Sequence, residues 1–201
     1  MHSHPPRTRK TSVSARQPAA KTAKTRVFDK PLRMLLRSPR ETHYLGQCIG
    51  TLLRGGEVLA LRGELGTGKT SLVRGIAEGL RAEPAMVSSP TFTLIHEYQG
   101  RLRLIHADLY RLTISQLENI GLNDYLDGHA VTAIEWADRW GAGLPSDRLE
   151  ICLSHHASGA RRVGLVAQGP SAQELLAALH ELRVKRRPPG APRQSRVQLP
   201  R

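Results

Sequence analysis

Eight consecutive residues have the composition of a phosphate-binding loop. They read Gly63-Glu64-Leu65-Gly66-Thr67-Gly68-Lys69-Thr70 and match G-x-x-x-x-G-K-[ST] at each fixed position. In such a loop the glycines let the backbone curl, so that N–H groups point at phosphate oxygens, while the lysine adds positive charge and the threonine hydroxyl binds Mg²⁺. We therefore predict a nucleotide site formed by Glu64, Leu65, Gly66, Thr67, Gly68, Lys69, Thr70 and Ser71.

Hydrolysis of a bound nucleotide needs two further groups, a carboxylate that holds Mg²⁺ and a residue that positions the attacking water. Glu135 follows the apolar run 130–134, and Asp108 follows the apolar run 104–107. We predict Thr70 and Glu135 as metal ligands and Lys69, Asp108 and Glu135 as the catalytic residues. The sequence leaves open which of the two acids activates water. Asp108 could also bind Mg²⁺ through water. The alternatives to a role in catalysis are that Glu135 is a solvated residue at a strand end and that Asp108 only caps a turn.

Two other residues are candidates for sensing or contact. Thr91 lies in the polar segment Ser89-Pro90-Thr91, in a loop that could reach the γ-phosphate and act as a switch. Trp136 directly follows Glu135 and is a candidate contact to the nucleotide or to a partner, or else a core residue. The histidines form no metal-ligand pattern, and we assign His106 to strand packing rather than to catalysis.

A sheet with flanking helices must position these groups. The apolar run at 58–61 predicts a buried strand before the glycine loop, and the apolar spacing at 70–77 predicts a helix after it. Further strands are expected at 33–36, 92–98, 102–107, 130–134, 149–153 and 163–166, with hairpin turns at 99–100 and 158–159. Short helices broken near Gly121 are expected from Ser115.

Two serines carry the signature of a helix start. Ser38-Pro39-Arg40-Glu41 combines a serine cap, a proline at the first helical position and a glutamate three residues after the cap, and the helix should run toward Leu53. Ser171, followed by Glu174, is expected to cap the last helix in the same way. Together the elements predict an α/β fold, a P-loop NTPase-like three-layer sandwich with a mixed, mainly parallel central sheet.

The charge of the chain is concentrated at its ends. Residues 1–26 and 183–201 each hold seven Lys/Arg and no acid; subtracting these fourteen charges from the net charge of +13 leaves residues 27–182 at −1. We predict disordered basic tails at 1–26 and 184–201 around an ATPase domain at 27–183. Attraction of the tails to RNA or to an acidic partner, and a transit peptide at the N-terminus, are the alternatives.

The two cysteines and the hydropathy indicate a compartment. Cys48 and Cys152 belong to no C-x-x-C pair, which argues for a reducing environment without a disulfide framework or a zinc site. No segment reaches the roughly eighteen apolar residues that a membrane span requires, and no secretory signal is found. We expect a cytoplasmic protein that does not contact a membrane.

Five motifs resemble, in order and spacing, those of the bacterial TsaE family. They are the glycine loop 63–70, Ser-Pro-Thr-Phe-Thr-Leu at 89–94, His-Ala-Asp-Leu-Tyr-Arg-Leu at 106–112, Leu-Glu-Asn-Ile-Gly-Leu at 117–122 and Ile-Glu-Trp at 134–136. The resemblance covers about residues 38–182. Ala107 and Ala137 depart from the family pattern, which usually has a bulky residue and a proline there, and neither change removes a charged group.

The resemblance implies an ATPase that uses ATP and Mg²⁺ and acts in tRNA threonylcarbamoyladenosine biosynthesis. It implies partners of the TsaB and TsaD type, which transfer threonylcarbamoyl to N6 of adenosine 37 in tRNAs reading ANN codons, while the ATP cycle resets the complex between turnovers. It also implies phosphate binding by Lys69, Mg²⁺ binding by Thr70 and Glu135, and support of hydrolysis by Asp108. Contact with tRNA is expected to be indirect, or direct through the basic tails.

Two other functions compete with this one. A small-molecule kinase could use the same glycine loop, although no arginine-rich lid stands out between Arg111 and Gly128. A nucleic-acid-binding protein could act through its two basic tails.

Overall fold

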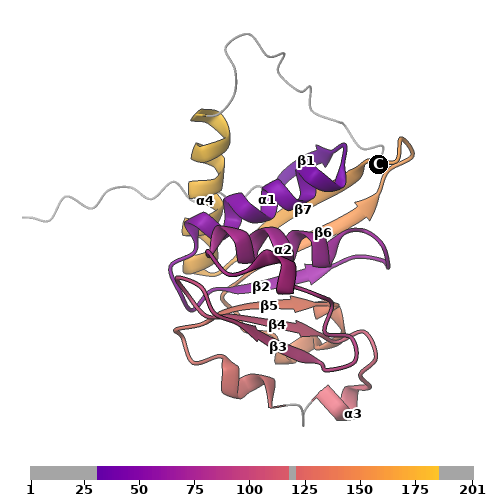
Figure 1. Ribbon diagram of the computed structural model, residues 1–201, viewed down its shortest axis with the longest axis vertical. Helices are drawn as coiled ribbons and strands as arrows, with labels where there is room; N and C mark the ends of the chain where they lie inside the picture. The colour runs from indigo at the N-terminus through magenta and orange to yellow at the C-terminus, as the bar shows by residue number, and fades with distance from the viewer. Residues whose placement is uncertain (1–30, 118–120, 186–201) are drawn as a thin grey trace, which may run out of the picture.

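The strands form a single mixed sheet in the computed structural model, which describes residues 31–117 and 121–185 (Figure 1). Across these residues the strand order is β1-β7-β6-β2-β5-β4-β3. β6, β2, β5 and β4 are parallel to one another, whereas the β1–β7, β7–β6 and β4–β3 pairs are antiparallel. The bounds are Leu32–Leu36 for β1, Val58–Arg62 for β2, Ile95–Tyr98 for β3, Leu104–Asp108 for β4, Val131–Glu135 for β5, Arg148–His155 for β6 and Arg161–Gln168 for β7. The expected α/β fold with a mixed sheet is confirmed, and the parallel strands form its centre.

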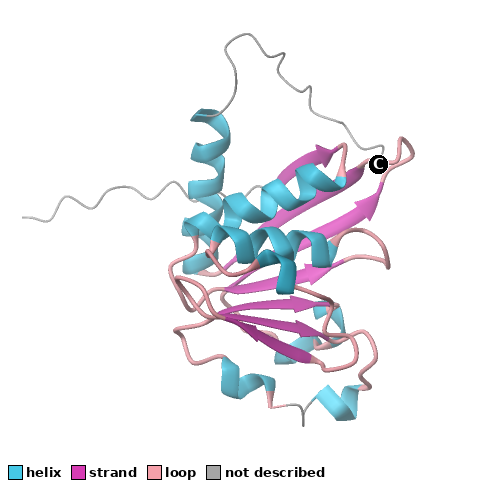
Figure 2. Cartoon of the chain, viewed as in Figure 1, coloured by secondary structure: helices cyan, strands magenta, loops and turns pink. Residues whose placement is uncertain are grey.

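Helices cover the two faces of the sheet unequally (Figures 1 and 2). α1 (Pro39–Leu52), α2 (Lys69–Gly79) and α4 (Pro170–Lys185) bury apolar residues in one cluster against one face. The other face is covered over β2, β4 and β5 by short pieces. These are α3 (Ile114–Leu117) and the 3-10 helices η2 (Leu122–Tyr125), η3 (Ala137–Arg139) and η4 (Gly141–Gly143); another, η1 (Pro84–Met86), follows α2. The third layer therefore spans only part of the sheet.

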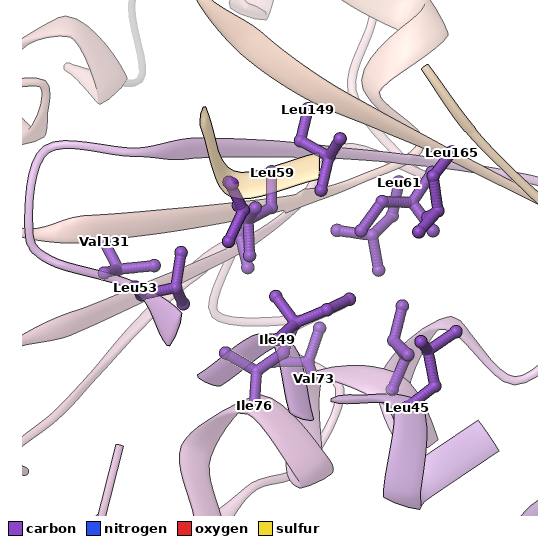
Figure 3. Packing of buried hydrophobic residues seen from close by; sticks show 14 of the residues in the cluster. Leu45, Ile49, Leu53, Leu59, Leu61, Val73, Ile76, Val131, Leu149 and Leu165 are labelled. Carbon is purple, nitrogen blue, oxygen red and sulfur yellow. The ribbon is translucent and has the colours of Figure 1, made fainter. Parts of the chain in front are cut away.

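The larger core follows from the alternation of side chains along the strands (Figure 3). Leu59 and Leu61 of β2 face the helices, where Ile49 of α1 and Ile76 of α2 meet them, and all four side chains are fully buried. Val58 and Ala60, which alternate with these leucines, face the second, smaller cluster on the other side of the sheet. Burial of one such side chain stabilises the fold by about 1.5–3 kcal/mol, so the central strand is held from both faces.

Helices α1 and α2 contact each other through glycines. Gly46 and Gly50 of α1 and Gly75 and Gly79 of α2 all lie where an added Cβ atom would approach the backbone of the other helix more closely than real Cβ atoms do. At Gly75, for example, it would lie 2.9 Å from the carbonyl carbon of His43 and closer still to its oxygen. The glycines thus allow α1 and α2 to pack closely against each other. The first turn of α2 carries Lys69 of the glycine loop.

The two helix starts predicted from serines have different outcomes. At Ser38 the prediction is confirmed, because its Oγ accepts a hydrogen bond of 3.2 Å from the Glu41 backbone N–H. The prediction that Ser171 caps the last helix is wrong: α4 begins one residue earlier, and the Asp147 carboxylate accepts 3.0 Å hydrogen bonds from the backbone N–H groups of Ser171 and Ala172. This cap comes from a residue more than twenty positions upstream, which no local pattern reveals.

One expected strand is shorter than predicted. β3 begins at Ile95 rather than at Phe92, because the chain turns over residues 91–94 and Leu94 adopts a left-handed conformation with φ 68°. The Leu94 backbone N–H donates to the Pro90 carbonyl over 2.6 Å, which closes the turn. The predicted strand at 33–36, the central strand at 130–134, the helical breaks around Gly121 and both hairpins are confirmed. The shortening of β3 keeps Thr91 in a loop.

Some expectations lie outside the described residues. The predicted tail 1–26 and residues 186–201 of the predicted tail 184–201 fall there, as do residues 118–120 of the fourth family motif. The described part of α4 continues through Lys185, so the expected tail boundary at 184 lies in its last turn. Within the described ranges, none of the helices is both long and apolar enough to cross a membrane.

Candidate nucleotide site

The candidate residues converge at one edge of the sheet. β2, β5 and β4 are adjacent and parallel, and their carboxyl ends lead into the glycine loop, Trp136 and Leu109, respectively. Asp108 and Glu135 are direct register partners on neighbouring strands. The carboxyl edge of parallel strands is where α/β proteins bind ligands, so the topology brings together groups that stand far apart in the sequence.

The glycine loop has the backbone that phosphate binding requires. Gly63, Gly66 and Gly68 have φ values of 141°, 75° and 102°, which residues with a Cβ rarely adopt. At Gly63 an added Cβ would also lie 3.0 Å from the Thr67 hydroxyl and nearer still to the Leu153 carbonyl oxygen. Helix α2 begins immediately afterwards at Lys69, with no side-chain cap. The free N–H groups of its first turn and its dipole make this end an anion site, so the loop fits a nucleotide phosphate.

Lys69 is held inside the loop. Its side chain is buried, and its Nζ donates to the carbonyl oxygens of Gly63 at 2.8 Å and Glu64 at 2.9 Å. Burial lowers the pKa of Lys69, while the negative charges of Glu135 and Asp108 act in the opposite direction. The ammonium group is therefore bonded to the loop carbonyls and attracted by the charges of the two acids.

Glu135 contacts the phosphate loop directly. The Thr70 hydroxyl donates to Glu135 Oε1 over 2.8 Å, and the glutamate is only 3% exposed. This answers the alternative raised from the sequence, because Glu135 is buried and bonded rather than solvated. A hydroxyl and a carboxylate are hard oxygen donors of the kind that Mg²⁺ prefers.

The donor set suits a metal held mainly by its nucleotide. Among the residues that the structure describes, no three His, Cys, Asp or Glu side chains are grouped as a metal site. Mg²⁺ in nucleotide sites uses one or two protein oxygens, phosphate oxygens and water. Thr70 and Glu135 therefore fit this ion, because Mg²⁺ in a nucleotide site does not require three or more protein ligands.

Asp108 ties the switch-candidate loop to the sheet. Its Oδ2 accepts hydrogen bonds from the Ser89 hydroxyl at 2.7 Å and the Thr91 hydroxyl at 2.5 Å, and its Oδ1 accepts the Tyr110 backbone N–H at 2.9 Å. The last bond is the capping role considered from the sequence, and the first two add a connection that it did not reveal. The aspartate is 2% exposed, so the loop closes over it.

Trp136 lies against the side chain of Lys69. Lys69 Nζ is 4.0 Å from the centre of the tryptophan ring, and the Tyr110 ring lies 4.7 Å from it between centroids. A cation over an aromatic face is an attractive contact. The Trp136 backbone is left-handed, with φ 57°, a conformation that costs about 1–3 kcal/mol in a non-glycine residue. Trp136 is thus half-buried at the site, and it also packs against the smaller core cluster.

The remaining predicted nucleotide contacts differ in exposure. Glu64, Leu65 and Gly66 are exposed at the tip of the loop, and Leu65 is 72% exposed. Thr67 is fully buried, and its hydroxyl donates to the Glu64 carbonyl at 2.8 Å. Ser71 lies in the first turn of α2 and is half-buried. The loop therefore has a rigid base and an open tip.

Sequence reasoning missed two residues of this site. Ser89 bonds Asp108 as Thr91 does, and His106, which we assigned to packing, places its Nε2 at 3.0 Å from Glu135 Oε1. The period of two along a strand puts His106 and Asp108 on the same face. That signal could have placed the histidine beside the acids.

Comparisons with known proteins agree with the motifs. A family model described as "Threonylcarbamoyl adenosine biosynthesis protein TsaE" matches residues 36–163. The tRNA threonylcarbamoyladenosine biosynthesis protein TsaE of Bacillus subtilis (strain 168) is 38% identical over 141 residues, which cover 70% of this chain and 88% of that protein. Its counterpart in Nostoc sp. (strain PCC 7120) is 36% identical over 155 residues, covering 75% and 94%.

A solved structure extends the likeness to the fold. The crystal structure of Bacillus subtilis YdiB matches with a TM-score of 0.66 and 32% identity, over 77% of this chain and 97% of that one. The matched family region, 36–163, contains the glycine loop, both candidate acids, the switch-candidate loop and Trp136. On these matches, the chain belongs to the TsaE family.

Proposed function

We propose that this protein is a Mg²⁺-dependent ATPase required for N6-threonylcarbamoyladenosine formation at position 37 of tRNAs that read ANN codons. It acts with TsaB and TsaD homologues and resets their complex between turnovers. The observation that carries the proposal is the contact between the phosphate loop and a buried acid, Thr70 to Glu135 at 2.8 Å, in a member of the TsaE family. The names of the matched relatives support the pathway.

In this proposal the glycine loop and the first turn of α2 bind the phosphates. Their backbone N–H groups surround the oxygens, and Lys69 exchanges its bonds to the Gly63 and Glu64 carbonyls for bonds to phosphate. Trp136 limits where the lysine can move, because its ring lies 4.0 Å from Nζ. The lysine thereby stays directed at the loop while its partners change.

Thr70 and Glu135 would hold Mg²⁺, which when bound neutralises charge on the transferring phosphoryl group. Both side chains come from rigid elements, the first turn of α2 and the end of β5. Their present hydrogen bond brings both oxygens to the same place.

We assign the orientation of the attacking water to Asp108. Glu135 Oε1 is already shared by Thr70 and His106, whereas the side-chain partners of Asp108 are the hydroxyls of Ser89 and Thr91, both on the adjacent loop. In the proposed cycle Thr91 leaves Asp108 to meet the γ-phosphate, which frees the carboxylate to accept a hydrogen bond from water. Loss of that phosphate lets Thr91 return, so the loop reports the nucleotide state to partners.

The test is ATP turnover by the purified full chain, alone and with the TsaB and TsaD homologues of the same organism. We expect the pair to stimulate turnover, and Lys69→Ala and Glu135→Ala to leave a folded protein that no longer supports tRNA modification in cells depleted of the wild type. An unchanged rate with intact ATP binding would refute the partner assignment. Normal tRNA modification with either variant, read by nucleoside mass spectrometry, would refute the role of ATP hydrolysis.

A further inference from the structure

His106 is a buried histidine at the centre of the site. It lies on β4 with no exposed surface, and its Nε2 is 3.0 Å from Oε1 of Glu135 on the neighbouring strand β5. The Tyr98 ring packs beside it, with centroids 6.4 Å apart. Both strands are internal to the sheet, so the imidazole has little freedom to turn.

The second ring nitrogen of His106 has no hydrogen-bond partner. Nδ1 is buried and unpaired within the described ranges. Because a carboxylate only accepts, Nε2 must carry the proton that joins it to Glu135. An unpaired buried polar atom costs about 1–3 kcal/mol, which an apolar residue in the same place would avoid. A residue that served only for packing could be apolar and would avoid this cost. The bond to Glu135 is therefore the feature that distinguishes His106 from a packing residue.

Glu135 Oε1 accepts two hydrogen bonds, from Thr70 and from His106. Thr70 is itself a proposed Mg²⁺ ligand, and its hydroxyl must then direct a lone pair at the ion. His106 is the one of these two partners that is not itself a proposed Mg²⁺ ligand, so metal binding does not require its donor to leave Glu135. It is therefore the partner suited to fix the rotation of the carboxylate while the ion binds.

We propose that His106 is a positioning residue that holds the Glu135 carboxylate in the orientation required for Mg²⁺ binding. This inference rests on the proposed function, because it assumes that Glu135 is a metal ligand. Residues that hydrogen-bond a metal ligand typically contribute 10–100-fold to metal affinity. The structure assigns that contribution to His106 Nε2–H.

Two amide variants separate the hydrogen bond from packing. In His106→Gln the amide nitrogen can occupy the place of Nε2 and still donate to Glu135, whereas the shorter amide of His106→Asn cannot reach it. Thr132→Val is the matched control, because Thr132 is 1% exposed on the same strand as Glu135 and three residues before it, which turns its side chain to the opposite face. His106→Leu replaces His106→Asn if the latter does not fold.

The measurement is the factor by which Mg²⁺ tightens ADP binding, taken from calorimetric titrations of the full chain in excess Mg²⁺ and in EDTA. We expect His106→Asn to reduce this factor about 10-fold and to leave the affinity in EDTA unchanged. His106→Gln should retain the factor to within about 3-fold, because it preserves one donor of ordinary strength. Thr132→Val should match the wild type, and melting curves show that each variant is folded.

The outcomes separate the inference from the function beneath it. A wild-type protein whose ADP affinity does not respond to Mg²⁺ would overturn the proposed metal role of Thr70 and Glu135, and the inference with it. A normal response in the wild type together with an equal response in folded His106→Asn or His106→Leu would overturn the inference alone. Equal losses in His106→Asn and His106→Gln would also contradict it, because the Nε2 donor would then not be the cause.

Discussion

Replacing Gly75 with alanine tests whether the glycine contact between α1 and α2 holds the helix that carries the phosphate loop. An added Cβ would lie 2.9 Å from the His43 carbonyl carbon and 3.0 Å from the Gln47 backbone nitrogen. The His43 carbonyl oxygen would lie closer still, and non-bonded heavy atoms in contact prefer about 3.5–4.0 Å, so the helices would have to separate by about 1 Å or more. The obstacle is backbone, which cannot rotate away.

The magnitude follows from two opposed effects. Overpacking of this kind costs about 1–3 kcal/mol and occasionally more, and a rigid backbone obstacle places Gly75→Ala at or above the upper end. Alanine recovers about 1 kcal/mol through its higher helix propensity. The net loss should be about 2–4 kcal/mol, which lowers the melting temperature by about 5–15 °C in a domain of this size.

The control is Gly164→Ala in β7. An alanine Cβ there would meet no atom within 4 Å, and the residue is not in the left-handed region. Alanine restricts the unfolded chain more than glycine does, so Gly164→Ala should be neutral or stabilise by about 0.4–1 kcal/mol. Thermal melts followed by circular dichroism compare the two variants. Equal melting temperatures would refute the reasoning, because only Gly75 faces a backbone obstacle.

Three further predictions concern the site and one cap. Glu135→Gln should raise the Mg²⁺ concentration needed for half-maximal ATP turnover by about 10–100-fold, and an unchanged Mg²⁺ titration would exclude Glu135 as a ligand. Asp108→Asn should lower kcat by about 10²–10⁴-fold with little change in ADP affinity; a loss confined to affinity would move Asp108 to nucleotide binding. Burial raises the pKa of Asp147, but hydrogen bonds from the Ser171 and Ala172 N–H groups outweigh it, and the pKa lies below its ordinary 3.8. Asp147→Ala should therefore lower the free energy of unfolding by about 1 kcal/mol near neutral pH. This difference should shrink as the pH falls below 3.8 and through the folded-state pKa. Denaturant titrations that show a pH-independent difference would contradict the charged cap.

Local signals in the sequence were sufficient for much of the fold. The phosphate loop, the serine cap at Ser38 and the two hairpins depend on residues close together in the chain, because turns, caps and strand alternation arise from short-range backbone and side-chain interactions. The glycine pattern likewise predicted a phosphate site at residues 63–70, and the positive φ values of Gly63, Gly66 and Gly68 fit that prediction. The ordered motifs identified the family, which the comparisons confirm.

Register and topology decided the rest. The bond between His106 and Glu135, the hydroxyl contacts of Asp108 and the Asp147 cap of α4 join residues 17 to 29 positions apart. No local pattern names these partners, because the pairing of β4 with β5, the pairing of β6 with β7 and the path of the intervening loops bring them into contact. The sequence by itself determined which chemical groups are present and which short elements carry them. Only the tertiary structure decided which carboxylate meets Thr70, which meets Thr91, and that a histidine assigned to packing is bonded to the first of them, since a hydrogen bond depends on distances that strand pairing sets.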